Sequence, residues 1–183
     1  MPPFRFEQVP GVERLKPREP ADVTGVIVHR IEVSQEDPSY GDAPSEVARF
    51  FREHPIGVKA TGGDMPYPIL VDRDGGVTQT VPLRFITPHA KAHNPGTVGV
   101  GVIGDFRKAP PSPRQRAAAV AVCAALLTRF ALKVETISGH DELQGGSNDP
   151  DKICPGPGLA PADVRDEVRA FLATHTAELA FVW

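Results

Sequence analysis

Short apolar runs rich in β-branched residues alternate along this chain with longer segments in which apolar residues recur at helical spacing. Apolar runs of roughly four to eight residues are typical of buried strands, and longer periodic segments are typical of helices. The predicted strands cover residues 23–28, 67–72, 77–81, 98–103 and 134–137. The predicted helices cover residues 46–54, 112–131 and 161–172. This alternation predicts an α/β fold, with a single domain and a central mixed β-sheet flanked by helices.

Local signals mark several of the element ends. Pro55 follows the first helix and stops it, and Ser112 with Gln115 three residues later is a capping-box start for the second helix. The segment 73–76, Arg-Asp-Gly-Gly, predicts a hairpin turn between two strands. Polar or Gly/Pro-rich segments between these elements are expected to be loops. They cover residues 33–43, 57–66, 82–97 and 138–158.

Composition limits the number of domains and the classes of partner. The chain has 183 residues, 40% of them apolar, which suits one well-filled domain. Residues 1–22 are rich in Pro and charge and are expected to form an N-terminal arm laid on a domain that covers residues 23–183. The net charge of −3 provides no basic field for nucleic acid. No run approaches the about 20 apolar residues that span a membrane, and no signal peptide is visible at the N-terminus.

The two cysteines lie in unlike surroundings. Cys123 falls in an apolar helical run, where a small buried hydrophobic side chain is expected. Cys154 falls in the polar segment 138–158. A disulfide framework is therefore not expected.

The segment 138–158 also holds the side chains that bind zinc or transfer protons. His140, Lys152 and Cys154 lie within fifteen positions of one another, and His29 follows the first predicted strand directly. If that strand and the strand before His140 are neighbours, both imidazoles meet at one edge of the sheet. Two histidines and one cysteine make a three-ligand zinc site with a position free for water. The residues alone leave open that these side chains are unrelated.

Five segments, in this order, resemble the zinc-dependent N-acetylmuramoyl-L-alanine amidases, whose fold is shared by phage T7 lysozyme and the peptidoglycan recognition proteins. The resemblance runs from about residue 23 to residue 172. The segments are 26–29 (Val-Ile-Val-His), 67–75 (Tyr-Pro-Ile-Leu-Val-Asp-Arg-Asp-Gly), 89–94 (His-Ala-Lys-Ala-His-Asn) with 98–104 (Val-Gly-Val-Gly-Val-Ile-Gly), 138–140 (Ser-Gly-His), and 149–156 (Asp-Pro-Asp-Lys-Ile-Cys-Pro-Gly).

The resemblance implies a zinc ion (Zn²⁺) bound by His29, His140 and Cys154. It also implies that Tyr67 and Lys152 assist catalysis, because they match the two assisting residues of the active members. Zinc brings the pKa of a bound water to about 7 and polarises the amide carbonyl. The phenol and the ammonium can then donate to the oxyanion or to the leaving amine.

Substrate-binding residues are implied by the same resemblance. His89 and Asn94 belong to the matching loop, and Arg30 lies at the edge of the cleft, where many relatives have a second histidine. A loop histidine hydrogen-bonded to the backbone stays an alternative for His89. Gly101 stands where another subgroup has an acid, and together with Cys154 and Tyr67 it implies that this chain belongs to the tyrosine–cysteine subgroup. The insert 143–149 is expected to decide how the substrate groove is closed.

The expected activity is hydrolysis of the amide between N-acetylmuramic acid and L-alanine in peptidoglycan. We expect a monomer without nucleic-acid or membrane partners, made in the cytoplasm and acting on the cell wall after release. A phage or prophage endolysin fits this expectation best. A secreted antibacterial effector and a cytoplasmic recycling enzyme stay alternatives, as does an enzyme for a different amide. A recognition module that binds peptidoglycan without cutting it is the rival class, although such members typically lack the cysteine ligand.

Overall fold

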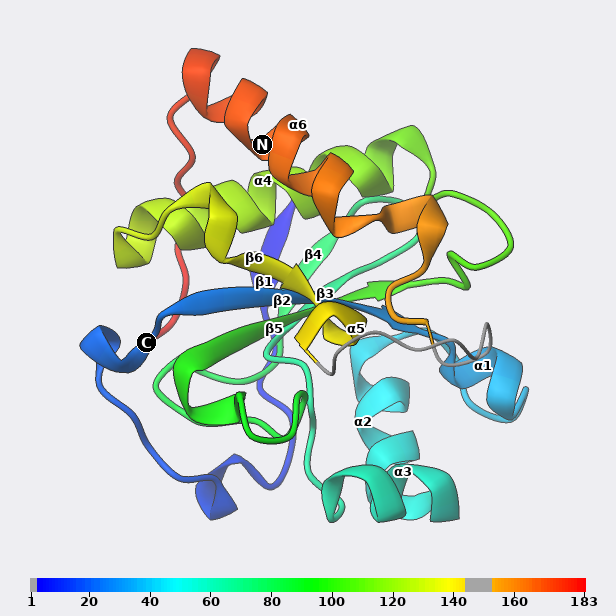
Figure 1. Cartoon of the computed structure of the whole chain (residues 1–183). Helices are drawn as coiled ribbons and strands as arrows, with labels where there is room; N and C mark the ends of the chain where they lie inside the picture. Colours follow the sequence, from blue (N-terminus) through cyan, green and yellow to red (C-terminus); the bar gives the residue numbers. More distant parts are fainter. Residues whose placement is uncertain (1–2, 144–152) are drawn as a thin grey trace.

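A six-stranded mixed sheet forms the centre of the molecule (Figure 1). The computed structural model describes residues 3–143 and 153–183. The strands in chain order are β1 (Phe4–Phe6), β2 (Gly25–Ile31), β3 (Ile69–Val71), β4 (Val77–Gln79), β5 (Thr97–Ile103) and β6 (Ile137–Gly139). Their order across the sheet is β1-β4-β3-β5-β2-β6. Among the described strands only the β3–β4 hairpin is antiparallel, which confirms the predicted mixed sheet.

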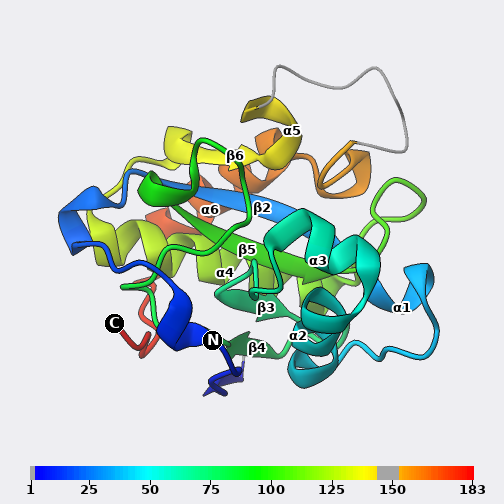
Figure 2. The same ribbon diagram turned by 90° about the horizontal axis from the view of Figure 1, so that it is seen from below.

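Helices cover both faces of this sheet, as expected for an α/β domain (Figure 2). One face packs against α4 (Pro113–Phe130) and α6 (Pro161–Thr174). The other face packs against α2 (Pro44–Glu53), with α3 (Pro55–Thr61) next to it. The described residues also form two single-turn α-helices, α1 (Val33–Glu36) and α5 (His140–Leu143).

The two central strands, β2 and β5, send alternate side chains into two separate cores. Their even-numbered valines all point toward α4 and belong to one hydrophobic cluster. These residues are Val26, Val28, Val98, Val100 and Val102. Ile31 and Ile103, at odd-numbered positions, belong to the cluster on the α2 side. His29 therefore faces α2, together with the side of β5 on which Gly99 and Gly101 carry no side chain.

The segment 57–66 was expected to be a loop, and this expectation is wrong for its first half. The helix α3 begins at Pro55, directly after α2, and ends at Thr61. Gly57 lowers intrinsic helix propensity, but here it allows α3 to approach α2 closely, since a Cβ at this position would lie 2.7 Å from the Cα of Phe51. Gly62 then ends the helix with a φ of 74°. The polar segment 33–43 likewise contains the short helix α1.

The strands that carry the histidines differ slightly from their predicted bounds. β2 continues past residue 28 to Ile31, because Arg30 and Ile31 pair with Val102 and Ile103 of β5, so His29 lies inside the strand rather than after it. Residues 134–136 form a 3₁₀ turn, and the strand β6 follows at Ile137–Gly139. His140 then opens the helical turn α5, so the segment 138–158 is not loop throughout.

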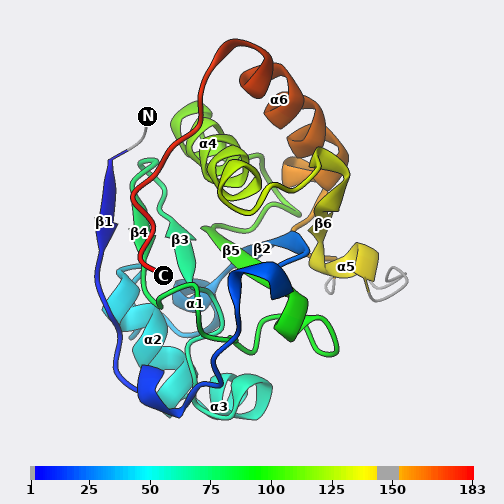
Figure 3. The same cartoon turned by 90° about the vertical axis from the view of Figure 1, so that its left-hand side faces the viewer.

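Both ends of the described chain lie against β4 (Figure 3). The strand β1 pairs in parallel with β4 at the edge of the sheet, and the backbone of Glu7 donates to the carbonyl of Gln79 at 2.9 Å. The side chain of Gln79 is fully buried and exchanges two hydrogen bonds with the backbone of Val182, at 2.7 and 2.8 Å. Residues 4–6 therefore extend the sheet, while the division of the chain at residue 22 stays a prediction.

Candidate metal centre

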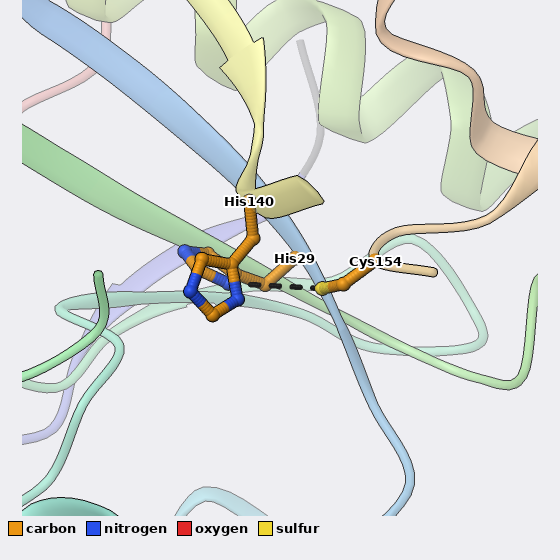
Figure 4. Close-up of side chains that lie close together, drawn as sticks. All are labelled: His29, His140 and Cys154. Atoms are coloured by element: carbon orange, nitrogen blue, oxygen red, sulfur yellow. Dashed lines mark hydrogen bonds between the residues drawn. The ribbon is translucent and has the colours of Figure 1, made fainter. Parts of the chain in front are cut away.

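Three side chains from distant parts of the chain converge beside the end of β6 (Figure 4). His29 comes from β2, and His140 follows β6, which pairs with β2 in parallel so that Val28 lies opposite Gly139. The two imidazole rings have their centroids 4.8 Å apart. The Sγ atom of Cys154 lies 3.8 Å from Nδ1 of His29. The potential ligand atoms of all three residues lie within 4.8 Å of one another.

The backbone around these residues holds the two ligand segments together. The N–H of Asp141 donates to the carbonyl of Cys154 at 2.9 Å. Gly139 makes this approach possible, because a Cβ there would lie 2.6 Å from Pro161 and 3.2 Å from the Cys154 carbonyl oxygen. Glu142 accepts from the N–H of Gly139 at 3.0 Å and fastens the turn to the end of β6.

The three donors suit a zinc ion in number and type, and one pair of them comes close to it in spacing. Imidazole nitrogen and thiolate sulfur are typical zinc ligands, and a tetrahedral ion with bonds of about 2.0–2.3 Å separates its donors by about 3.3–3.6 Å. The distance of 3.8 Å between Cys154 Sγ and His29 Nδ1 is close to such a tetrahedral edge. Three protein donors leave a fourth position for water or substrate, which is typical of catalytic rather than structural zinc sites.

Tyr67 lies beside the histidines, just before β3. Its ring centroid is 5.1 Å from that of His29. Gly101 of β5 leaves the space for this ring, because a Cβ at position 101 would lie 2.9 Å from Cγ of Tyr67. The face of β5 that carries Gly99 and Gly101 is thus covered by the side chains of His89 and Tyr67. Tyr67 and His140 both line a cavity of about 210 Å³. Its other lining residues are Phe51, Ala60, Thr61, Pro66, Pro88, His89 and Lys91.

The three residues predicted to bind substrate lie in different places. His89 is 5% exposed, packs against His29 and lines the same cavity as Tyr67. Arg30 forms an ion pair with Glu32. The Oδ1 atom of Asn94 accepts from the N–H of Ala90 at 2.6 Å, and the residue lines a separate cavity of about 190 Å³. His89 contacts the predicted ligand His29, and Arg30 interacts with the predicted ligand Cys154.

A family model described as N-acetylmuramoyl-L-alanine amidase matches residues 19–157. The chain belongs to this amidase family. No curated protein matches the amidase in a search by sequence. Several solved structures match its fold.

LysC, an amidase from Clostridium intestinale URNW, is 13% identical with a TM-score of 0.69, over 92% of this chain and 99% of that one. The Ph2119 endolysin from a Thermus scotoductus bacteriophage is 21% identical with a TM-score of 0.64, over 90% and 99% of the two chains. Drosophila PGRP-LB is 19% identical with a TM-score of 0.62, over 88% and 92%. These likenesses show that the amidase shares its fold with endolysins and peptidoglycan recognition proteins.

Burial controls the protonation of the amidase's candidate ligands. Desolvation lowers the pKa of His29 well below its usual value, and the neighbouring His89 and His140 add to this effect. Desolvation also lowers the pKa of His140. Both imidazoles are therefore neutral near pH 7, as metal binding requires. Burial raises the pKa of the Cys154 thiol, while Arg30 opposes that change.

The structure confirms two further predictions, which concern Cys123 and Ser112. Cys123 is fully buried in α4, as expected, and burial raises its pKa to about 12. Ser112 caps α4 as predicted, by accepting from the N–H of Gln115 at 3.2 Å. Lys152 lies outside the described residues, as does the insert 143–149 after its first residue, Leu143.

Sequence reasoning missed two arginines, Arg107 and Arg18, that connect segments lying next to the candidate ligands. Arg107 lies 2.6 Å from Glu32 and 2.7 Å from Asp105, so it joins the Arg30–Glu32 pair to the loop after β5. Arg18, from the N-terminal arm, is 6% exposed and reaches the loop that carries His89. These partners are separated by 75 and 79 positions, and no local sequence pattern relates residues so far apart.

The described helices include none that is both long enough and apolar enough to cross a bilayer.

Proposed function

We propose that this amidase hydrolyses the amide between N-acetylmuramic acid and L-alanine of peptidoglycan, with a zinc ion bound by His29, His140 and Cys154. The observation that carries this proposal is the convergence of these three donors beside the phenol of Tyr67, within 4.8 Å for the ligand atoms and 5.1 Å for the rings of Tyr67 and His29. The family match to peptidoglycan amidases supports the substrate class.

A zinc ion held by His29, His140 and Cys154 would supply Lewis acidity for the scissile carbonyl and a nucleophilic water near neutral pH. The protein has to keep the ligands unprotonated and hold a hydrogen-bond donor near the reacting carbonyl. Burial of the two imidazoles meets the first requirement, since it keeps both rings neutral. The low exposure of His29, at 1%, also excludes bulk water from one side of the site.

Tyr67 is the proposed donor to the oxyanion that develops on the amide oxygen. Burial raises the pKa of this phenol, so the hydroxyl keeps its proton throughout the neutral range. A neutral phenol next to the ligands can donate a hydrogen bond that strengthens as negative charge develops. Lys152 is proposed as a second donor, to the oxyanion or to the leaving amine, because it matches the assisting lysine of the active relatives.

The cavity beside Tyr67 and His140 is the proposed position of the substrate. Its volume is about 210 Å³, its walls are largely apolar, and Lys91 supplies a cation at its rim. A peptide stem carries carboxylates that such a cation can pair with. His89 borders this cavity, whereas Asn94 and Arg30 stay predicted substrate ligands.

The proposed setting is a phage or prophage endolysin that acts as a monomer on the cell wall after release, without nucleic-acid or membrane partners. Similarity in fold to the bacteriophage Ph2119 endolysin supports this setting. A secreted antibacterial effector is the second candidate. A recognition module that binds peptidoglycan without cutting it is disfavoured, because Cys154 and Tyr67 are both present.

Mass analysis of purified peptidoglycan digested with the full chain tests the reaction. We expect release of intact stem peptides with a free N-terminal L-alanine, loss of that release in Cys154→Ser, and restoration by zinc after chelation of the wild type. Cys123→Ala is the matched control, because it removes the other thiol from an alanine-rich helix. Cleavage at another bond, or activity that survives both Cys154→Ser and chelation, contradicts the proposal.

A further inference from the structure

Only one ring nitrogen of His29 is open to a metal. Its Nε2 lies 3.1 Å from Nδ1 of His89, within hydrogen-bond distance. Its Nδ1 lies 3.8 Å from Sγ of Cys154. A metal ligand must offer a lone pair, so Nδ1 serves as donor only when the ring proton is on Nε2. The tautomer of His29 therefore depends on what His89 presents to it.

The surroundings of His89 determine its own tautomer. Its Nε2 lies 3.3 Å from both the carbonyl oxygen and the Oγ1 of Thr97. A carbonyl oxygen can only accept a hydrogen bond. The Thr97 hydroxyl donates its single proton to the carbonyl of His93, at 2.7 Å, and so presents a lone pair to His89. Nε2 of His89 therefore carries the proton, and its Nδ1 accepts from Nε2–H of His29.

The ring of His89 is held in this position from both sides. It is 5% exposed and packs edge-on against His29, with centroids 5.3 Å apart. On its other side it lies against β5, where a Cβ at Gly99 would be 2.8 Å from Cγ of His89. The ring is thus held between the backbone of one strand and a side chain of its neighbour.

Arg18 holds the carbonyl to which His89 donates. Its Nη1 donates to the Thr97 carbonyl at 2.6 Å, and its Nε donates to the Leu83 carbonyl at 2.9 Å. Longer contacts of 3.4 and 3.3 Å join Nη1 to the carbonyls of Asn94 and Pro95. One side chain from the N-terminal arm thus connects the start of β5 with both ends of the loop that carries His89.

Burying the Arg18 guanidinium costs desolvation free energy, so its position in the structure needs an explanation. Arg18 is 6% exposed, and desolvation lowers its pKa to about 10. The negative charge of Asp22 offsets only part of this desolvation, and within the described part of the chain the Nη2 atom of Arg18 has no hydrogen-bond partner. Its rigid fork of donors can reach several carbonyls at once, which a lysine ammonium or an amide does less well.

We propose that Arg18 and His89 are positioning residues of the metal centre, which fix the tautomer of His29 so that Nδ1 faces the metal. The chain of contacts runs from Arg18 through the Thr97 carbonyl and His89 to His29. The N-terminal arm is then part of the functional site. This inference rests on the zinc site of the proposed function. Partners that orient a ligand histidine typically change metal affinity by about 10–100-fold when they are removed.

Nitrogen-15 spectra of the histidine rings test the inference directly. The probe is the full chain with labelled histidine, recorded with and without zinc. We expect His29 to bind zinc through Nδ1 with the proton on Nε2, and His89 to keep its proton on Nε2. A His29 ring bound through Nε2, or a His89 ring protonated on Nδ1, overturns the inference and leaves the zinc site intact. A chain that takes up no zinc overturns both proposals.

Paired variants of His89 separate positioning from simple packing. His89→Leu removes the acceptor and is expected to weaken zinc binding by about 10–100-fold in competition with a chelator. His89→Asn places an oxygen near the position of Nδ1 and is expected to recover most of that affinity. His175→Gln, at the exposed end of α6, is the matched control and is expected to bind zinc as the wild type does. Equal losses in both His89 variants overturn the proposed role.

Arg18→Met tests the outer half of the chain of contacts, with the exposed Arg84→Met as its control. We expect zinc affinity to fall by about 10-fold in the first variant and to stay unchanged in the second. Arg18→Lys, which keeps the charge and loses the fork, is the second variant if Arg18→Met does not fold. It is expected to give mixed tautomers at His89. An unchanged His89 spectrum in a folded Arg18 variant overturns the role of Arg18.

Discussion

The two faces of the central sheet are built on the same two strands but are packed in opposite ways. On the side of α4 and α6, alternate valines of β2 and β5 pack against buried alanine, valine and leucine side chains of α4. On the side of α2, two glycines of β5 remove the side chains, and the rings of Tyr67 and His89 occupy that space. On this face the rings of Tyr67 and His89 cover the strands, whereas on the other face apolar side chains do.

Because of this difference, one residue of β2 contributes to stability while the next one contributes to the metal centre. Val28 points into the valine and alanine core, whereas His29 points to the metal centre. A change at either residue should therefore affect one property and leave the other nearly intact. Paired substitutions on the two faces test that separation.

Substitution of His29 and of its neighbour Val28 gives the largest contrast. His29→Ala is expected to abolish zinc uptake and stem-peptide release, because it removes one of three ligands. Val28→Ala is expected to lower the free energy of unfolding by about 2 kcal/mol, because it leaves a small cavity, while zinc uptake stays unchanged. Metal analysis, peptide release and urea denaturation measure both. Loss of zinc in a folded Val28→Ala protein would show that the two faces are coupled.

Tyr67→Phe removes only the hydroxyl from the glycine-side face. We expect kcat to fall by about 10²–10³-fold, as for loss of one oxyanion donor. Zinc affinity and the unfolding midpoint should stay close to those of the wild type, because the ring remains in the space above Gly101. Steady-state peptide release with matched metal analysis provides the measurement. A kcat within a factor of three of the wild type rules out the phenol as an oxyanion donor.

Substituting alanine for Gly99 and for Gly101 should affect two different properties, zinc affinity and kcat. Gly99→Ala pushes against His89 and is expected to lower zinc affinity by about 10-fold. Gly101→Ala pushes against Tyr67 and Ile31 and is expected to lower kcat by about 10-fold at saturating zinc, because the phenol shifts. Zinc titration and kcat measured on both variants test this division. The same effect from both substitutions would mean that this face responds as a unit.

The smallest expected effect concerns Asp105, at the rim where β5 ends. Hydrogen bonds from Arg107 hold the pKa of this carboxyl well below its usual value, and Lys108 adds to the effect. A lowered folded-state pKa stabilises the fold above about pH 4, and this contribution is lost as the pH falls. Asp105→Asn should therefore lose about 1–2 kcal/mol at pH 7 and show a flatter acid limb between about pH 5 and pH 2. Urea denaturation across that range provides the measurement, and parallel curves for the two proteins contradict the assignment.

The sequence was sufficient to predict the central strands of the sheet because their signals are local, whereas the ligand set came from the resemblance to the amidases. Runs such as residues 23–28 and 98–103 identify buried strands by composition alone, and parallel pairing then brings His29 and His140 to one place. The α3 helix was missed because Gly57 lowers helix propensity, whereas close packing against α2 favours a residue without a side chain there. Tertiary contact overrode local preference at that position.

The polar surroundings of the candidate site could not be predicted in the same way. Arg18 is an ordinary charged residue of a Pro-rich arm in the sequence, and only the fold shows that its partner is the carbonyl of Thr97. His89 was expected at the substrate groove, and its contact with His29 spans 60 positions. Backbone carbonyls carry no sequence signature, so a contact that ends on one is invisible until the fold is known.

The hydrogen bonds that join Gln79 to Glu7 and to Val182 affect how the protein folds while it is being synthesised. The residue leaves the ribosome about a hundred positions before Val182, and its side-chain amide has its backbone partner only after that residue has been synthesised. The β3–β4 hairpin can form early, but the Gln79 side chain can form these hydrogen bonds only after residue 182 has left the ribosome. Nascent chains halted before residue 182 should therefore expose the β4 side of the molecule to proteases while β2 and β5 are already protected.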